Sequence, residues 1–162
     1  MPKVPISALD KAVKLLSFRA LSEGELRKKL REAGFPEEEV SAAADECRKR
    51  HYIDDAMLAA DYTALLRSRN TGSRVIRQKL AKRQLTAEAD GGLPEEDSPQ
   101  EERDAARRAM DYKWRLLARE SDLRKKRDKT IRFLIGRGFP PPLIFELLEE
   151  KISGTDEDIN DY

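Results

Sequence analysis

The sequence predicts an all-α protein, built as a tandem array of three-helix repeats that are similar to helix-turn-helix units. Apolar side chains recur every three or four residues along most of the chain, which is typical of amphipathic helices. The segments 25–35, 75–85 and 129–139 align at offsets of 50 and 54, in both apolar spacing and stop residues. A period of this length predicts units that pack against their neighbours.

The first repeat, residues 8–53, is expected to contain three short helices. One face of the first helix holds Leu9, Ala12, Val13, Leu16 and Ala20. Ser22 and Glu25 have the spacing of a capping box, which would start the second helix. Gly34 is placed to end that helix in the left-handed conformation, and Pro36 suits the first turn of the third. The inward face of the third helix holds Val40, Ala43, Ala44 and Cys47.

The second repeat, residues 54–86, shows two clear helices. Asp54 can cap the first of them. Its apolar side holds Leu58, Tyr62, Leu65 and Leu66. The turn at 70–72 stops this helix, and Ser73 can cap the next. That next helix carries Ile76 and Leu80 and ends at Leu85.

Residues 87–101 are predicted to form an acidic loop, where the third helix of the second repeat would otherwise stand. The segment contains Gly91-Gly92, Pro94 and Pro99, and it lacks a helical apolar pattern. Two interpretations remain open. Either that helix is lost, or the long helix expected over 101–119 supplies its packing.

The third repeat, residues 102–152, begins with this long helix, in which Leu116 and Leu117 are expected to be core residues. Leu134 and Phe139 repeat the spacing of the earlier copies. Three prolines then precede a last helix, whose apolar residues are Leu143, Ile144, Leu147 and Leu148. Residues 153–162 are an acidic tail.

Charge is unevenly distributed, although the net charge is only +1. Residues 62–86 hold seven basic side chains and no acidic one, and this run is the candidate partner-binding face. Its members are Arg67, Arg69, Arg74, Arg77, Lys79, Lys82 and Arg83. Such a face suits DNA phosphates or an acidic protein surface, and the competing interpretation is an ordinary solvated helix face. A secondary basic patch consists of Arg124, Lys125, Lys126 and Arg127.

Several classes of function find no support in the residues. Cys47 is the only cysteine and His51 the only histidine, so we expect neither a disulfide nor a metal site. There is no glycine-rich phosphate loop, nucleophile elbow or cysteine–histidine couple, so we expect no enzyme, no catalytic residue and no cofactor. Because no apolar run approaches 18 residues, the chain is predicted to be cytoplasmic and without a membrane partner.

One stretch, HYIDDAMLAADYTALLRSRNTGSRVIRQKLAKRQL at 51–85, resembles the core signature of the RecX family. Residues 21–40 (LSEGELRKKLREAGFPEEEV) and 133–150 (FLIGRGFPPPLIFELLEE) are similar to its first and last repeats. The chain departs from the family pattern at His51, where a small residue is usual, and at Gln84-Leu85, where a Gly-Ile type pair is usual.

The resemblance implies an elongated, curved stack of repeats that regulates bacterial homologous recombination, DNA repair and the SOS response. Such a protein would act as a monomer. It would bind the RecA filament on single-stranded DNA and inhibit its assembly, ATPase and strand exchange, while binding naked single-stranded or double-stranded DNA weakly. The alternative is a helix-turn-helix-like DNA-binding protein that acts alone, because three-helix units with a basic last helix also describe that class.

Overall fold

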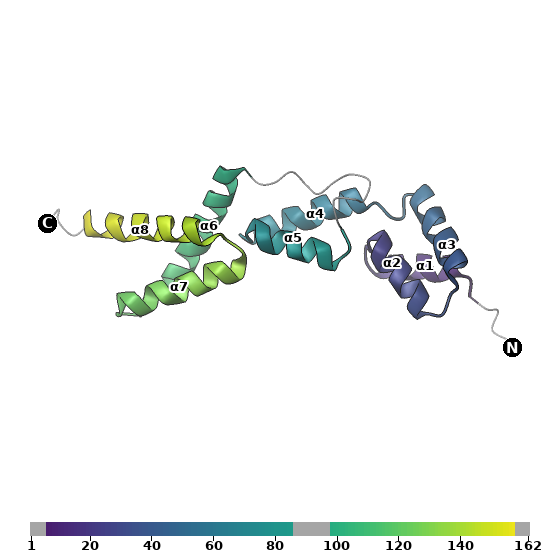
Figure 1. Cartoon of the computed structure of the whole chain (residues 1–162), viewed down its shortest axis with the longest axis horizontal. Coiled ribbons are helices and arrows are strands. Elements are labelled where there is room, and N and C mark those ends of the chain that lie inside the picture. Colours follow the sequence, from purple (N-terminus) through teal and green to yellow (C-terminus); the bar gives the residue numbers. More distant parts are fainter. Residues whose placement is uncertain (1–5, 86–97, 158–162) are drawn as a thin grey trace. The chain divides into compact units, whose positions relative to one another are not determined.

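The computed structural model describes residues 6–85 and 98–157, which contain eight α-helices and no strand (Figure 1). The helices are α1 (Ala8–Phe18), α2 (Glu23–Glu32), α3 (Glu37–Lys49), α4 (Asp55–Ser68), α5 (Ser73–Lys82), α6 (Pro99–Leu116), α7 (Leu123–Arg137) and α8 (Pro141–Glu157). The predicted all-α class is therefore confirmed.

The described residues fall into two compact units, and the division runs through the second repeat. The first unit ends at Thr63 and resumes at Lys79, so it holds the whole first repeat, most of α4 and the end of α5. The second unit holds Ala64–Gln78 and the chain from α6 onward. The second repeat thus contributes one part of α4 and α5 to each unit.

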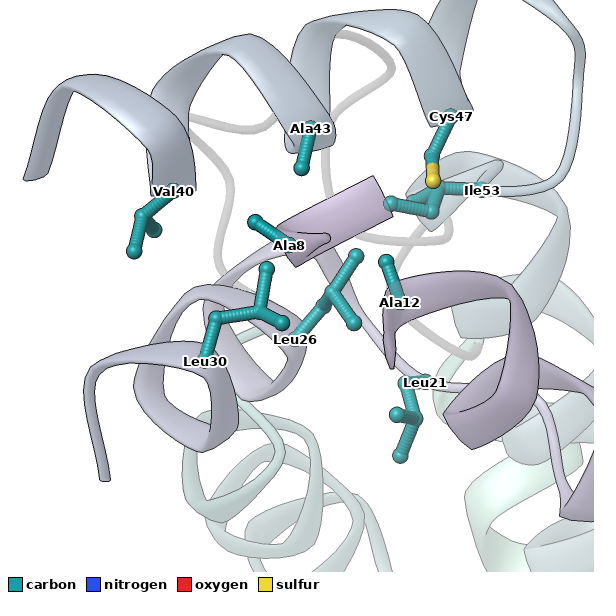
Figure 2. Close-up of a cluster of buried hydrophobic side chains, with 9 residues drawn as sticks. All are labelled: Ala8, Ala12, Leu21, Leu26, Leu30, Val40, Ala43, Cys47 and Ile53. Carbon is teal, nitrogen blue, oxygen red and sulfur yellow. The ribbon is translucent and has the colours of Figure 1, made fainter. Parts of the chain in front are cut away.

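The core of the first unit is a cluster of small and branched side chains from α1, α2 and α3. Its buried members are Ala8, Ala12, Leu21, Leu26, Leu30, Val40, Ala43, Cys47 and Ile53, which point toward one another in Figure 2. The predicted inner faces of α2 and α3 are confirmed. The predicted inner face of α1 was partly wrong. The side chain of Val13 is 42% exposed, and Ala20 lies beyond the helix, which ends at Phe18, whereas Ala8 is buried.

The second helix of every repeat ends in the same way. One or two residues past the helix end the backbone takes a positive φ, which is +90° at Gly34, +57° at Gln84 and +96° at Gly138. The following N–H groups, of Phe35, Leu85 and Phe139, donate to the carbonyls of Leu30, Leu80 and Leu134 at 3.2, 3.0 and 3.2 Å. This pattern is a Schellman motif, which satisfies carbonyls that the helix end would leave unpaired. The offsets of 50 and 54 predicted from the sequence are confirmed at the level of single hydrogen bonds.

The core of the second unit is built mainly from α6, α7 and α8. Its buried members are Ala105, Ala106, Ala109, Met110, Leu134, Phe139, Ile144, Leu147 and Leu148. The expectation that Leu116 belongs to the core was wrong, because its side chain is 61% exposed. Alanines two to three turns earlier carry the packing, and in the last turn of α6 Trp114 packs against the core while Leu116 faces outward.

Helix α6 begins at Pro99, inside the range expected to be loop. Ser98 and Glu101 form a complete capping box there, and a proline at the first helical position has its φ set for the helix. Residues 87–97 of the predicted loop lie outside the described residues.

Candidate functional site

The seven residues of the candidate basic face are divided between the two units. Arg67, Arg69, Arg74 and Arg77 belong to the second unit, and Lys79, Lys82 and Arg83 belong to the first. Along α5, Ile76 and Leu80 are buried as predicted, with 5% and 2% of their surface exposed. Arg74, Arg77 and Lys82 are exposed on the same helix, and Arg69 is exposed just beyond α4, whereas Arg67, Lys79 and Arg83 are half-buried.

Arg83 is engaged by groups of its own unit. Its Nη2 donates to the Ala20 carbonyl at 2.8 Å and to Oε2 of Glu25 at 3.0 Å. The guanidinium also lies over the ring of Tyr62, 5.2 Å from the ring centroid, a distance typical of a cation–π contact. Only 18% of the Arg83 side chain is exposed, so little of its surface is accessible to an external ligand.

Glu25 is the acidic partner in this arrangement. Burial alone would raise the pKa of its carboxyl, but hydrogen bonds from Arg83, from the Ser22 N–H and from Arg19 hold that pKa below its ordinary value of 4.5. The carboxylate is therefore kept charged beside Arg83. The pair lies within the first unit and stabilises that unit's structure.

The start of α5 is held by side chains and backbone groups of the second unit. Nη2 of Arg74 donates to the Ile135 carbonyl at 2.7 Å. The Gly72 N–H donates to the carbonyl of Arg137 at 2.8 Å. Ser73 donates through both its N–H and its hydroxyl to Glu102, each at 3.1 Å. Arg74 therefore combines an exposed position with a contact to the end of α7.

The secondary patch occupies the first turn of α7. No acidic residue lies within that turn, and only the N-cap Asp122 precedes it. Cations at a helix N-terminus oppose the helix dipole, at a cost of roughly 0.3–1 kcal/mol each. The local sequence therefore keeps cations where helix stability alone would favour acids.

The four members of this patch differ in their partners. Lys126 lies over the ring of Trp114 at 4.5 Å, and Arg127 pairs with Glu149 at 3.0 Å. Lys125 is exposed and 3.7 Å from the Asp122 carboxylate, and Arg124 is exposed. A shallow hollow beside them is lined by Leu123, Arg124, Arg127, Asp128 and Ile131. Trp114 itself packs against the core of the second unit.

Two carboxylates of structural importance were missed by reasoning from the sequence. Glu102 is buried, with 9% exposed, and it binds the N-terminus of α5 from 29 positions away. Asp55 accepts the Glu23 N–H at 2.9 Å at the start of α2. No signal local to either helix start announces these partners, because both carboxylates come from a later helix.

Two further features of the described residues concern metal binding and the single thiol. They contain no group of three or more histidine, cysteine, aspartate or glutamate side chains that could hold a metal ion. Burial raises the pKa of the Cys47 thiol, which keeps it protonated and poorly nucleophilic. Among the helices described here, none is both long enough and apolar enough to span a bilayer.

Comparison with known proteins places these features in a family. The model of the first three-helix domain of RecX matches residues 8–47, and that of the third three-helix domain matches residues 100–148. The regulatory protein RecX of Vibrio campbellii is 30% identical over 153 residues, which cover 94% of each chain. That of Chlorobaculum tepidum is 33% identical over 134 residues, covering 82% of this chain and 81% of the relative.

Solved structures agree with the fold. A crystal structure of RecX from Lactobacillus salivarius aligns with a TM-score of 0.68 at 18% identity, covering 88% of this chain and 93% of the other. Another crystal structure, of a regulatory protein RecX, aligns with a TM-score of 0.67 at 23% identity, covering 88% and 70%. From the two domain models and the identity shared over most of the sequence, we conclude that this chain belongs to the RecX family of regulatory proteins.

Proposed function

We propose that this protein regulates the RecA filament on single-stranded DNA, inhibiting filament assembly, ATPase and strand exchange by binding rather than by catalysis. Membership of the RecX family carries the proposal. The surface chemistry adds a location, because cations stand exposed on α5 and at the start of α7. We expect the protein to act as a monomer in the cytoplasm.

The contact residues that we propose are the exposed members of the two basic sets. They are Arg69, Arg74, Arg77 and Lys82 around α5, and Arg124 and Lys125 on α7. A filament of RecA on DNA presents both protein and phosphate, and exposed guanidinium and ammonium groups suit either. Arg83 is left out of this set, because it is paired with Glu25 inside the first unit.

A second candidate function is a DNA-binding protein that acts without RecA. The observation that favours it is the cationic character of α5 and α7, each the second helix of a three-helix unit. The two functions differ in the affinity for naked DNA. A stand-alone binder holds DNA tightly at moderate salt, whereas a filament regulator binds naked DNA weakly and depends on RecA.

The test is the DNA-dependent ATPase of RecA from the same organism, titrated with this protein. We expect inhibition at less than one molecule per RecA protomer. The triple variant Arg69→Ala, Arg77→Ala, Lys82→Ala is expected to need roughly tenfold more protein for half-inhibition, equivalent to about 1.4 kcal/mol. The matched control is Lys14→Ala, Lys28→Ala, Lys49→Ala, which removes the same charge from exposed positions of the first repeat.

Either of two results would contradict the proposal. Wild-type protein without effect in excess over RecA, but with tight and salt-sensitive binding to an oligonucleotide, would favour the stand-alone DNA binder. Equal inhibition by the triple variant and its control would remove the α5 cations from the contact surface.

A further inference from the structure

A similar set of contacts occurs twice, at helix ends that are related by the repeat. The first joint lies in the first unit, between the start of α2 and the end of α5. The second joint lies in the second unit, between the start of α5 and the end of α7. In each joint the second helix of one repeat receives the C-terminal end of the second helix of the next.

The carbonyl of an arginine forms the first part of each joint. In the first joint, the hydroxyl of Ser22 donates to the Arg83 carbonyl at 2.5 Å. In the second, the Gly72 N–H donates to the Arg137 carbonyl at 2.8 Å. Ser22 and Gly72 are separated by the offset of 50, and Arg83 and Arg137 by the offset of 54. The hydrogen bonds are therefore equivalent by position, although one donor is a side chain and the other is backbone.

The guanidinium of the same arginine forms the second part. It donates to a backbone carbonyl just beyond the first helix of the preceding repeat, which is that of Ala20 for Arg83 and that of Arg69 for Arg137. Each guanidinium also lies over an aromatic ring, but these rings are not equivalent by position. Arg83 lies over Tyr62 of α4 at 5.2 Å, and Arg137 lies over Phe133, four residues earlier in α7 itself, at 5.0 Å. One planar, multi-donor group thus binds a carbonyl while it lies over a ring, and its fixed fork of donors distinguishes it from the ammonium group of a lysine.

A carboxylate from the next repeat forms the third part. Asp55 of α4 accepts the Glu23 N–H at 2.9 Å, and Glu102 of α6 accepts the Ser73 N–H at 3.1 Å. Glu23 and Ser73 are the first residues of α2 and α5. Each carboxylate satisfies a free N–H group at a helix start and complements the positive end of the dipole.

We propose that Arg83 and Arg137 are positioning residues, which fix the second helix of one repeat against that of the next through the same three-part joint. The consequence for RecA rests on the proposed function, since a regulator that binds a periodic filament needs fixed spacing between its contact helices. In this proposal Arg83 and Arg137 do not contact RecA or DNA themselves. They determine the positions of the helices that carry the exposed contact residues.

Charge-conserving substitutions separate this role from a contact role. Arg83→Lys and Arg137→Lys keep the charge and lose the planar donor set, whereas Lys82→Ala removes a neighbouring exposed charge. In a full-length Cys47→Ala background, spin labels at positions 28 and 81 report the first joint, and labels at 78 and 128 report the second. We expect Arg83→Lys to broaden only the first distance distribution, Arg137→Lys only the second, and Lys82→Ala neither.

Hydrogen exchange gives an independent measure. In Arg137→Lys, the Gly72 amide is expected to exchange about tenfold faster, a loss of about 1.4 kcal/mol in local stability. If Arg83→Lys fails to fold, Ser22→Ala tests the first joint, because it removes the bond to the Arg83 carbonyl and keeps the guanidinium. Since Ser22 also caps α2, the control is Ser7→Ala, which removes a helix N-cap in the same unit and no bond of the joint. Unbroadened distances together with unchanged exchange would overturn the proposal.

These measurements contain no RecA, so they stand apart from the proposed function. A wild type that does not inhibit RecA, but whose joints loosen as described, would refute only the function. The opposite case is that the Arg83→Lys and Arg137→Lys variants inhibit RecA at the same protein concentration as wild type and both distance distributions stay as narrow. This result would refute only the joints.

Discussion

The two joints achieve the same arrangement with different chemistry. The first is made of side chains, with the Ser22 hydroxyl as a donor and the pair of Arg83 and Glu25 largely shielded from solvent. In the second, the equivalent donor is a backbone group, because Gly72 donates its N–H, and the backbones approach closely, since a Cβ added there would lie 2.6 Å from the carbonyl carbon of Gly138. The two helix ends are therefore placed in the same way in both joints, but the groups that hold them differ.

This difference determines how each joint can be broken. Atoms added at Gly72 meet backbone, which cannot move aside without separating the two helix ends. A Cβ added at Gly24, in the first joint, meets the side chain of Gln84, 2.4 Å from its Oε1 and 2.8 Å from its Cβ. The second joint is therefore sensitive to added volume, and the first is sensitive to lost polar partners and to pH.

The largest effect is expected from Gly72→Ala. Overpacking a rigid contact typically costs 1–3 kcal/mol, and the Gly72 hydrogen bond to Arg137 is weakened at the same time, so we expect a loss of about 3 kcal/mol. Chemical denaturation monitored by circular dichroism measures it. In the first joint, Gly24→Ala is expected to cost less, because the helix propensity gained by alanine, up to about 1 kcal/mol, offsets part of the contact with Gln84.

Gly136→Ala is the matched control for this substitution. Gly136 lies within α7 and a Cβ there meets nothing within 4 Å. Alanine in an open helical position is expected to add about 0.5–1 kcal/mol. Equal stabilities for Gly72→Ala and Gly136→Ala would show that the Gly72–Gly138 approach is looser than the structure has it.

An intermediate loss of stability is expected when the pH is lowered, because Glu25 of the first joint becomes protonated. The pKa of Glu25 lies below its ordinary 4.5, so the ionised carboxylate stabilises the fold above that pH, and this contribution is lost as the pH falls through the lowered value. Glu25→Gln removes a charge-assisted pair, with an expected loss of about 2 kcal/mol at neutral pH. The variant should also lose less stability than wild type on acidification below pH 4.5.

For Asp55 the expected dependence of stability on pH has the opposite sign. Burial raises the pKa of its carboxyl above the ordinary 3.8, so its ionisation opposes folding at neutral pH and its protonation favours folding as the pH falls. Asp55→Asn, whose amide oxygen can still accept the Glu23 N–H, should leave neutral stability unchanged or slightly raised. Thermal unfolding from pH 3 to pH 7 measures the stability of both the Glu25→Gln and the Asp55→Asn variants.

For Glu25, parallel curves of stability against pH for Glu25→Gln and wild type would mean that the carboxylate is not held by Arg83.

The features that the sequence predicted are those encoded within a few residues. The capping box of Ser22 and Glu25 and the left-handed stop at Gly34 need only local spacing, and both occur as expected. The repeat offsets were predictable because they combine such local signals. They located the equivalent helix ends, including Gln84, where no glycine marks the stop.

The features that were not predicted depend on contacts between distant segments. Nothing near Arg83 in the sequence indicates that Glu25, 58 positions away, will withdraw it from a run of seven cations. Leu116 was misplaced for a related reason, since an apolar side chain at the end of a helix is buried only if the neighbouring helices extend that far. Amino-acid composition and the repeat period can locate a charged helix in the sequence. Which of its charged side chains remain exposed depends on how the helices pack.

The smallest effect is expected at the stop of α5. Gln84 adopts a φ of +57°, whereas glycines occupy the equivalent stops at Gly34 and Gly138. A side chain in the left-handed region costs roughly 1 kcal/mol, so Gln84→Gly should raise the free energy of unfolding by up to that amount. The gain competes with the loss of the contact between the Gln84 side chain and Gly24, and with the greater freedom of glycine in the unfolded chain. Gln84→Ala, which loses the contact and keeps the strained φ, separates these contributions. Because relief of the φ should outweigh both losses, Gln84→Gly is expected to be the most stable of the three proteins. A glycine variant less stable than the alanine variant would show that the strain at this left-handed stop is smaller than the conformational freedom that glycine loses on folding.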